Sequence, residues 1–460
     1  MTQSIAITAD APHASDASTT RIAELSALAA DLIERARSRG ADQAELVLNE
    51  SRGLNVGVRL GDVETVEYMR DRGLSLTVYF NQSKASASSA DLSPASLEAT
   101  LDQACAIARY TEADPAAGLG DAERMATEFP DLDLWHPWAL DADAAVELGI
   151  ACETAGREAD TRIGNSEGAS VSSGEQIGVY ANSYGFVGGE RGTHHSISCS
   201  LIAGHGDGMQ RDYWYTTALS ANDLEAPEAV GRRAAERAVR RLDPRSPPTG
   251  RFPVLFSSEM ARSLIGHLLG AVAGSAQYRE ASFLLGAIGE HVFPEWFSLR
   301  ERPHQPRGLN SANFDGDGVA TLDSDLIRDG VLARYVLGSY SARRLGLEST
   351  GNAGGVHNLI ASEGLQDLPT LLRGMGRGLY VTELMGQGVN AVTGDYSRGA
   401  AGFWVEHGEL AYPVDEATIA GSLKQIFLAL EAVGSEVDPR SHIRVGPMLI
   451  GTMMVAGSGA

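Results

Sequence analysis

One histidine, His267, lies in a segment whose pattern is typical of a strand followed by a helix. The segment Arg251–Gln277 reads RFPVLFSSEMARSLIGHLLGAVAGSAQ. Its apolar run predicts a strand over Phe252–Phe256, and Ser257 is a typical cap for a helix that continues to Gly274. A histidine in the middle of such a helix can transfer protons or bind a metal in a hydrolase. His267 is therefore the first candidate for chemistry in this chain.

The neighbours of His267 do not complete a zinc motif. A zinc-binding helix carries two ligand residues one turn apart and a carboxylate beside them, as in HExxH. The residues one turn from His267 are Ser263 and Ala271, which are not zinc ligands. We predict no metal-binding residue in this chain, and the ordinary interpretation of a lone histidine on an apolar helix is a core or interface residue.

Glycines recur at every fourth position of the same helix. Gly266, Gly270 and Gly274 form a stripe without side chains. Another backbone, or an extended peptide, can approach such a stripe closely. We predict that these glycines and His267 form a surface for a peptide or a partner protein.

A second group of polar residues lies in TELMGQGVNAVTGDYSRGAAGFWVEHGELAYPV, which begins at Thr382. The segment is otherwise apolar and glycine-rich, so we expect its polar side chains to be buried in a hydrogen-bonded network at a cleft or an interface. Two of its acids, Glu383 and Asp395, are candidate catalytic residues together with His267. The predicted substrate or interface residues of this segment are Thr382, Glu383, Asn390 and Tyr396.

The elements that must position these residues predict an α+β fold. Apolar residues at helical spacing predict a helix over Ile22–Arg39, and strand-like segments and a second helix complete an N-terminal module of helices and antiparallel sheet, residues 21–110. A second α+β module is predicted over residues 111–241. Residues 251–460 are predicted to form a β-rich, glycine-rich C-terminal domain with a last helix at Ile419–Val433.

Two further segments are expected to lie outside these modules. Residues 1–20 resemble a disordered tail. The tract Leu242–Gly250, LDPRSPPTG, contains three prolines, which is typical of a linker between domains.

Charge and cysteine content limit the partners and the compartment. The 460 residues include 37 basic and 60 acidic side chains, a formal net charge of −23. Because such a surface repels nucleic acid and anionic lipid, we expect neither as a partner. No apolar run reaches the roughly 18 residues that cross a bilayer, and no secretory signal pattern is present. The three widely spaced cysteines, Cys105, Cys152 and Cys199, indicate a reducing compartment, so we expect a cytoplasmic protein.

Two other groups of residues only partly match metal sites. NFDGDGVATLDSD has four aspartates, but Val319 and Ala320 stand where the EF-hand requires an acceptor and then a glycine. A solvated turn is therefore expected there. His194 and His195 are adjacent, and adjacent strand residues face opposite sides, so only one of them can join His205 at a metal.

Two long segments together resemble a known family. FPVLFSSEMARSLIGHLLGAVAGSAQYREASFLLGAIGEHVF and TELMGQGVNAVTGDYSRGAAGFWVEHGELAYPVDEATIAG are similar to the PmbA/TldE branch of the TldD/PmbA family, once described as modulators of DNA gyrase. The resemblance extends over most of the chain, from DRGLSLTVYFNQSKASASSADLS onward. It implies a cytoplasmic bacterial or archaeal protein with a TldD/PmbA fold that acts in peptide processing.

The resemblance also implies where a metal would be held. In the TldD branch a helix carries HExxxH, which binds zinc together with a cysteine near the C-terminus. Here Gly266 and Ala271 stand where the two histidines would be, His267 stands where the glutamate would be, and no cysteine follows Cys199. The resemblance thus implies a metal-free subunit.

One half of a heterodimeric metallopeptidase is the function that this resemblance implies. The chain would pair with a TldD-like homologue that carries the zinc motif, and would shape the chamber for an extended peptide substrate while the partner hydrolyses it. We expect no cofactor in this chain and zinc in the partner subunit. A homodimer is a further possibility when the partner is missing.

Two other functions stay open. The first is a regulatory or binding protein without peptidase activity, as the gyrase-modulator description suggests. The second is a homodimeric hydrolase with a cryptic site around His267, Glu383 and Asp395.

Overall fold

The computed structural model describes residues 14–457 of the chain. The chain folds into two compact units. The first comprises Met1–Val239 and Asn313–Ala320, and the second comprises Arg240–Ala312 and Thr321–Ala460. Each unit combines helices with largely antiparallel sheet, and the second is rich in strands, so the predicted α+β class is confirmed.

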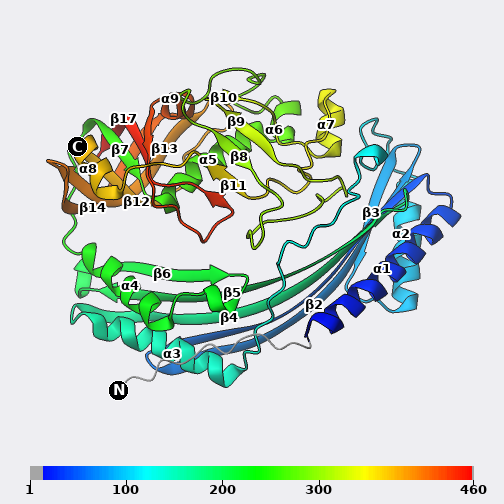
Figure 1. Cartoon of the computed structure of the whole chain (residues 1–460), viewed down its shortest axis with the longest axis horizontal. Helices are drawn as coiled ribbons and strands as arrows, with labels where there is room; N and C mark the ends of the chain where they lie inside the picture. The colour runs from blue at the N-terminus through cyan, green and yellow to red at the C-terminus, as the bar shows by residue number, and fades with distance from the viewer. Residues whose placement is uncertain (1–13, 458–460) are drawn as a thin grey trace. The chain divides into compact units, whose positions relative to one another are not determined.

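A six-stranded antiparallel sheet forms the frame of the first unit, with strand order β3-β2-β1-β4-β5-β6 (Figure 1). Its central strand β1 pairs with β2 on one side and with β4 on the other over almost its whole length. The strands are β1 (Gln43–Arg59), β2 (Asp62–Phe80), β3 (Ser83–Ser89), β4 (Ile163–Asn182), β5 (Val187–Ala203) and β6 (Gln210–Ala218).

Helices cover one face of this sheet in two separate groups. Leu46 and Leu48 of β1 pack against α1 and α2, whereas Leu54 and Val56 of the same strand pack against α3 and α4. Because alternate strand residues share a face, both groups lie on the same side of the sheet. The helices are α1 (Ala14–Ser38), α2 (Pro94–Ala108), α3 (Ala142–Ala159) and α4 (Pro227–Arg240); the short 3-10 helices η1 (Ala122–Arg124), η2 (Gly206–Gly208) and η3 (Ala221–Asp223) lie in the connections.

The second unit contains two sheets. The larger has the order β14-β13-β12-β7-β17-β15 and the smaller the order β10-β9-β8-β11-β16. The larger sheet comprises β7 (Gly250–Phe256), β12 (Gly378–Met385), β13 (Asp395–Glu406), β14 (Glu409–Ser422), β15 (Leu430–Val433) and β17 (Met448–Ala456). The smaller comprises β8 (Leu299–Glu301), β9 (Ser324–Arg328), β10 (Val331–Leu332), β11 (Leu359–Ala361) and β16 (Ile443–Arg444).

One helix, α5, lies on the main core of the second unit. Its residues Leu264 and Leu268 pack with Val254 and Phe256 of β7 in the largest apolar cluster. On the opposite face of the larger sheet, α8 packs against Leu255 in a smaller cluster. The helices of this unit are α5 (Ser258–Val272), α6 (Gly274–Tyr278), α7 (Ser339–Leu345), α8 (Leu368–Met375) and α9 (Leu423–Leu428). Within residues 14–457, no helix has both the length and the apolar character that a membrane crossing requires.

Several sequence predictions differ from the structure. The N-terminal helix begins at Ala14, so the predicted disordered tail is wrong for residues 14–20, while residues 1–13 lie outside the described part. The two N-terminal modules do not form separate bodies, because β1 of the first pairs with β4 of the second. The predicted last helix is mostly strand: β14 continues to Ser422, and only Leu423–Leu428 is helical.

The second unit is not one continuous segment of the chain. The proline-rich tract belongs to the second unit, where the Arg245 amide donates to the Pro413 carbonyl at 2.9 Å. Residues 313–320 belong instead to the first unit. There the Asp315 carboxylate accepts from the amides of Asp317 and Val319 at 2.9 and 3.0 Å, which closes a turn in the aspartate-rich segment.

Helices α3 and α4 touch at a glycine, which gives a prediction about stability. A Cβ atom at Gly231 would lie 1.9 Å from the carbonyl oxygen of Cys152, so Gly231→Ala must push the two helices apart. We expect Gly231→Ala to lower the free energy of unfolding in urea by about 2 kcal/mol. Gly374→Ala is the matched control, because a Cβ at that helical glycine meets open space; it should be neutral or stabilising by up to about 1 kcal/mol. Equal effects of the two variants would contradict the close helix contact.

Candidate functional site

The candidate site is built on helix α5, which starts where β7 ends in the middle of the larger sheet. Strand β7 pairs with β12 in parallel and with β17 in antiparallel orientation. The Ser257 amide donates to the Val381 carbonyl of β12 at 2.9 Å, and the Ser257 hydroxyl caps the helix by accepting from the Met260 amide at 3.3 Å. The strand and capped helix predicted from the sequence are therefore confirmed.

Charged residues fix the first turn of α5 to a distant part of the chain. Arg440, which is 9% exposed, donates to Glu259 at 2.7 Å and to Asp438 at 2.8 and 3.1 Å. A guanidinium nitrogen of Arg262 also lies 3.4 Å from a carboxylate oxygen of Asp438. Burial alone would raise the pKa of Asp438, but its hydrogen bonds and ion pairs with these arginines outweigh burial and leave the pKa below its usual value. The negative Glu259 also lies at the helix N-terminus, where an anion is favoured.

His267 faces Tyr396 of β13. The centroids of the two rings are 5.8 Å apart at 76°. Arg398 lies two residues beyond Tyr396 and therefore on the same face of β13. The Nε2 atom of His267 and the hydroxyl of Tyr396 are both buried, and neither has a hydrogen-bond partner within residues 14–457. Buried polar atoms without partners are uncommon in native proteins and are costly, so they indicate a place where another molecule can supply the partner.

Both groups are neutral at ordinary pH. Burial lowers the pKa of His267, and the positive charge of Arg398 lowers it further. Burial raises the pKa of Tyr396, and Arg398 only partly opposes this. A neutral imidazole and a neutral phenol can donate and accept hydrogen bonds, so this cluster is suited to binding polar groups such as peptide amides.

The site does not fit a zinc ion. Gly266 has no side chain, Ala271 is buried and apolar, and the cationic Arg398 lies near His267, the one imidazole of this helix. Among the residues that the structure describes, no three His, Cys, Asp or Glu side chains are grouped so that they could hold a metal ion.

The glycine stripe is shorter than the sequence suggested. Gly266 and Gly270 are exposed, and a Cβ atom at either would meet open space. Gly274 is buried. The side chain of Ser341 packs so closely against it that a Cβ atom at Gly274 would lie 2.4 Å away. Gly274 therefore packs within the unit and does not belong to the predicted surface.

The candidate catalytic residues are not brought together. Glu383 pairs with Arg241. Asp395 is exposed and precedes Tyr396 in β13, so it lies on the face of the strand away from His267. Thr382 is at a β-bulge of β12, between Val381 and Glu383.

The predicted buried network around this segment is also wrong for most of its members. Asn390 is exposed and shapes a local turn, where its side chain accepts from the amides of Val392 and Thr393 at 2.9 and 3.3 Å. Asp395 accepts from the Thr393 hydroxyl at 2.6 Å in the same turn. Of the four residues predicted to line the surface, only Tyr396 is buried.

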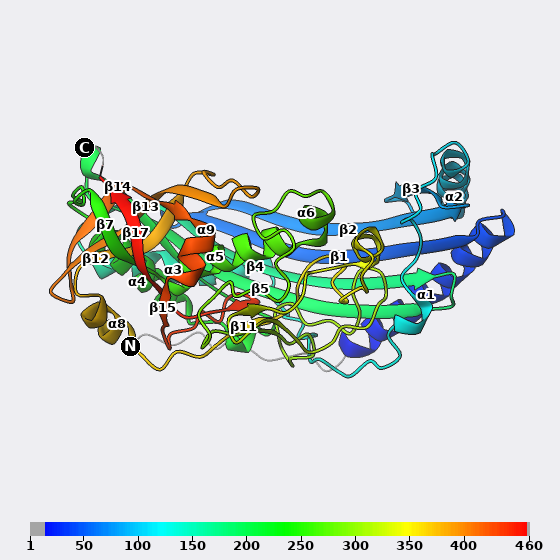
Figure 2. The ribbon, with the colours of Figure 1, turned by 90° about the horizontal axis from the view of Figure 1, so that it is seen from above.

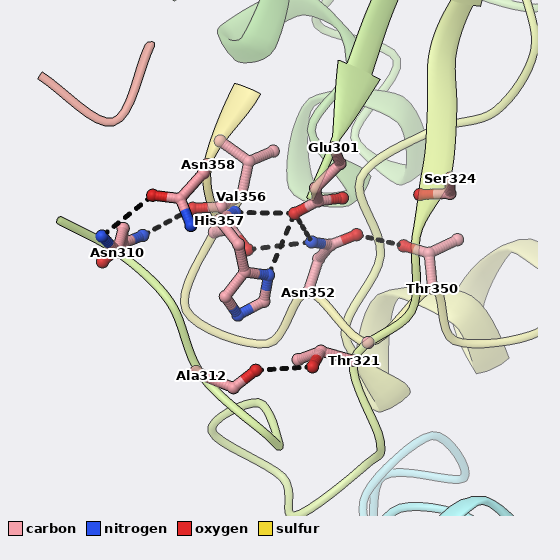
Figure 3. A network of polar contacts seen from close by, with 12 residues as sticks. Glu301, Asn310, Ala312, Thr321, Ser324, Thr350, Asn352, Val356, His357 and Asn358 are labelled. Carbon is pink, nitrogen blue, oxygen red and sulfur yellow. Dashed lines mark hydrogen bonds and ion pairs between the residues drawn. The ribbon is translucent and has the colours of Figure 1, made fainter. Parts of the chain in front are cut away.

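A different buried polar network was not found from the sequence. Its centre is Glu301, which is 1% exposed at the end of β8 (Figure 3). Its carboxylate accepts from the His357 amide at 2.6 Å, from His357 Nδ1 at 2.9 Å and from the Asn352 side chain at 2.9 Å, and it pairs with Arg334. The only sequence signal is the density of polar residues in the glycine-rich tract 351–358, because the partners lie far apart along the chain.

This network fixes the loop that precedes β11. Asn352 also accepts from the Thr350 hydroxyl at 2.8 Å and from Arg334 at 3.0 Å. Burial alone would raise the pKa of Glu301, but the hydrogen bond from His357 and the charge of Arg334 outweigh burial and lower the pKa. Burial lowers the pKa of His442, which lies beside β16. The charges of the nearby Arg262 and His357 lower this pKa further. The network therefore lies close to the anchored first turn of α5.

Replacement of Glu301 tests the network. A carboxylate with a lowered pKa stabilises the fold above its unfolded value of about 4.5, and this contribution is lost as the pH falls through the lower folded value. At neutral pH we expect Glu301→Gln to lower the free energy of unfolding by about 3 kcal/mol, because Arg334 loses its partner. The difference from the wild type should shrink below about pH 4. Glu295→Gln, at an exposed glutamate, is the control; a pH-independent effect of Glu301→Gln would contradict the ion pair.

Removal of the Tyr396 hydroxyl tests whether this group serves the fold. Since the hydroxyl is buried and has no partner in the described part of the chain, Tyr396→Phe should leave the unfolding free energy unchanged or raise it by up to about 1 kcal/mol. Tyr180→Phe is the matched control, because that hydroxyl donates to Glu45 at 2.9 Å; it should cost about 1 kcal/mol. An equal loss in both variants would show that the Tyr396 hydroxyl makes a structural hydrogen bond.

Comparison with known proteins places the chain in a family. Three family models match it in order: PmbA/TldA metallopeptidase domain 1 at residues 44–108, the central domain at 135–242 and the C-terminal domain at 249–457. The metalloprotease PmbA of Escherichia coli O157:H7 is 48% identical over 418 residues, which are 91% of this chain and 93% of that protein. A metalloprotease PmbA homologue of Haemophilus influenzae is 43% identical, over 93% of this chain and 94% of the relative.

Solved structures have the same fold. A protein from Bacteroides thetaiotaomicron described as a modulator of DNA gyrase aligns with a TM-score of 0.90 at 28% identity, over 94% of this chain and 99% of its own. TldE from Thermococcus kodakarensis aligns with a TM-score of 0.82 at 20% identity, over 93% and 99% of the two chains, and supports the fold alone. The protein described here belongs to the PmbA/TldD metallopeptidase family.

Proposed function

We propose that this chain is the metal-free subunit of a TldD–TldE-type heterodimeric metallopeptidase, and that it shapes the peptide-binding chamber while a zinc-bearing partner hydrolyses the peptide. The observation that carries the proposal is the composition of α5 at the positions of the zinc motif: a bare glycine at Gly266 and a buried alanine at Ala271. The names of the relatives, which are metalloproteases, support a role in peptide processing.

The surface beside α5 is suited to an extended peptide. Gly266 and Gly270 leave the helix bare, so a peptide backbone can approach it. The buried Nε2 of His267 and the hydroxyl of Tyr396 would hydrogen-bond to peptide amides or carbonyls. Recognition through the main chain carries little side-chain information and would allow many sequences to bind.

The partner subunit would supply the reactive group. Zinc bound by the partner's HExxxH motif would supply Lewis-acid chemistry for hydrolysis of the peptide bond. In this chain the same helix holds no ligand set, and its residues would orient the peptide. We place the pair in the cytoplasm, because Cys105, Cys152 and Cys199 are buried free thiols, which fits a reducing compartment.

A second candidate function is protein regulation without proteolysis. It is favoured by the description of the Bacteroides structure as a modulator of DNA gyrase. The net charge of −23 opposes direct contact with DNA, so this function would require a protein partner.

Peptide cleavage by the isolated chain and by the pair tests the proposal. The chain alone with added zinc should give no turnover, whereas co-purification with a homologue that carries HExxxH should give a complex that cleaves peptides. In that complex, Gly270→Leu should lower kcat/KM by about tenfold or more, because the side chain fills the bare surface of α5. Gly374→Leu is the matched control, since this exposed helical glycine lies on α8.

Two outcomes would count against the proposal. Robust turnover by the chain alone that a chelator abolishes would show that it is itself a metallopeptidase. Recovery of gyrase, and of no HExxxH homologue, from the source cell would favour the regulatory function.

A further inference from the structure

One stretch of β2 in the first unit is an open sheet edge. Strand β3 pairs with β2 only from Leu74 to Phe80. Over Thr65–Gly73 the inner side of β2 pairs with β1, while the outer side has no backbone partner within residues 14–457. Figure 2 shows β2 along the side of the sheet, with β3 beside one end of it. Nine strand residues give roughly 30 Å of edge whose amides and carbonyls can pair with another strand.

The same stretch borders a hollow of about 760 Å³ in this unit. The hollow lies on the helix-covered face, in the gap between the apolar cluster under α1 and α2 and the one under α3 and α4. Its charged and aromatic lining consists of Arg21, Glu50, Arg52, Arg70, Asp71, Arg72 and Glu175, together with Trp135.

Two of the arginines in the hollow are already neutralised. Arg21 donates to Glu50 at 3.0 and 2.6 Å, and Arg52 donates to Glu175 at 2.8 Å. The remaining charged groups of the lining are Arg70, Arg72 and Asp71, so positive charge exceeds negative charge by one in the hollow.

Arg70 and Arg72 supply this excess, because no carboxylate forms a hydrogen bond with either of them within the described residues. Arg70 forms no hydrogen bond or ion pair with any described residue, and Arg72 donates only to the Ala90 carbonyl, at 3.2 Å. The indole Nε1 of Trp135 is also buried without a partner in the described part of the chain. The hollow thus offers hydrogen-bond donors and positive charge in a protein whose net charge is −23. An anionic group would satisfy these donors.

The spacing of the two arginines matches an extended chain. Arg70 and Arg72 are alternate residues of β2, so they lie on one face about 7 Å apart. A peptide that adds to the open edge as a strand repeats its side chains on that face with the same spacing. We propose that the open edge of β2 binds an extended acidic peptide segment by strand addition, with Asp or Glu side chains at alternate positions paired to Arg70 and Arg72. The inference rests on the proposed function in one respect: the acidic segment would be part of a peptide substrate of the proposed peptidase.

A second copy of β2 fits this edge less well. If two copies paired antiparallel across the middle of the open stretch, Met69 would face itself and Glu67 would face Asp71 of the other copy. Like charges directly opposite each other destabilise a strand pair. The same pairing would place Val66 opposite Arg72 and Tyr68 opposite Arg70, so neither arginine would meet a carboxylate.

Direct binding to the isolated chain, without zinc or a partner, tests the inference independently of peptidase activity. The probe is a short acetylated and amidated peptide with Glu at alternate positions among Thr and Val, titrated by calorimetry at low salt. We expect binding that weakens with added salt. Arg70→Gln and Arg72→Gln should each weaken it by about tenfold, through loss of a charged hydrogen bond. Arg37→Gln is the matched control, since Arg37 is an exposed arginine on α1.

Two control peptides separate the parts of the inference. The same peptide with Gln in place of Glu should bind at least about tenfold more weakly, because the carboxylates are removed. The acidic peptide with N-methyl groups on alternate amides keeps the charges but cannot pair along a strand edge, so it should lose most of the binding. Equal binding of the Glu and Gln peptides, no effect of Arg70→Gln and Arg72→Gln, equal binding of the N-methylated peptide, or self-association through β2 without peptide binding would each overturn it.

Discussion

The candidate site depends on one junction, where β7 ends and α5 begins. The hydrogen bond between the Ser257 amide and the Val381 carbonyl joins the helix cap to β12, the strand that neighbours β7 in the sheet. Because β13 pairs with β12, this junction also sets the position of Tyr396 relative to His267. The two buried groups without partners therefore face each other as a result of backbone pairing, and no direct bond between them is required.

Buried charges hold the surroundings of that junction in place. Arg440 and Asp438 fix the first turn of α5 to the segment before β16, and Glu301 fixes the loop before β11, which pairs with β16. Charged groups in a low-dielectric interior are costly unless every one has its partner, so such networks allow few alternative arrangements. In this protein the networks support the helix and its bare glycine face, and two buried polar atoms without partners, His267 Nε2 and the Tyr396 hydroxyl, lie at the surface where we propose that peptide binds.

The first unit uses a different construction. Its sheet carries two apolar clusters on one face, and the strands between them continue with charged residues such as Glu50 and Arg52. Apolar contacts hold helices at both ends of the sheet, and charged strand residues lie between the two clusters. The hollow follows from this division, whereas the edge of β2 is open because β3 pairs with β2 only from Leu74 to Phe80.

The local sequence pattern was sufficient to predict much of the fold and part of the site. The serine cap and the apolar run predicted β7 and α5, and residue types alone show that this helix has no HExxH pattern. The segment Ile419–Val433 was misread as a helix, because its long-range pairing with β13 and β17 outweighs local propensity.

The sequence by itself determined the α+β class, the family and the position of a capped helix without the HExxH pattern. Only the tertiary structure decided that Gly274 is buried while Gly266 and Gly270 are open, that Asp395 lies away from His267, and that Glu301 gathers His357, Asn352 and Arg334. The physical reason is that spacing along a chain fixes which residues share a face of one element. Which faces meet, and which polar atoms remain without partners, depends on strand pairing between residues that are far apart in the sequence.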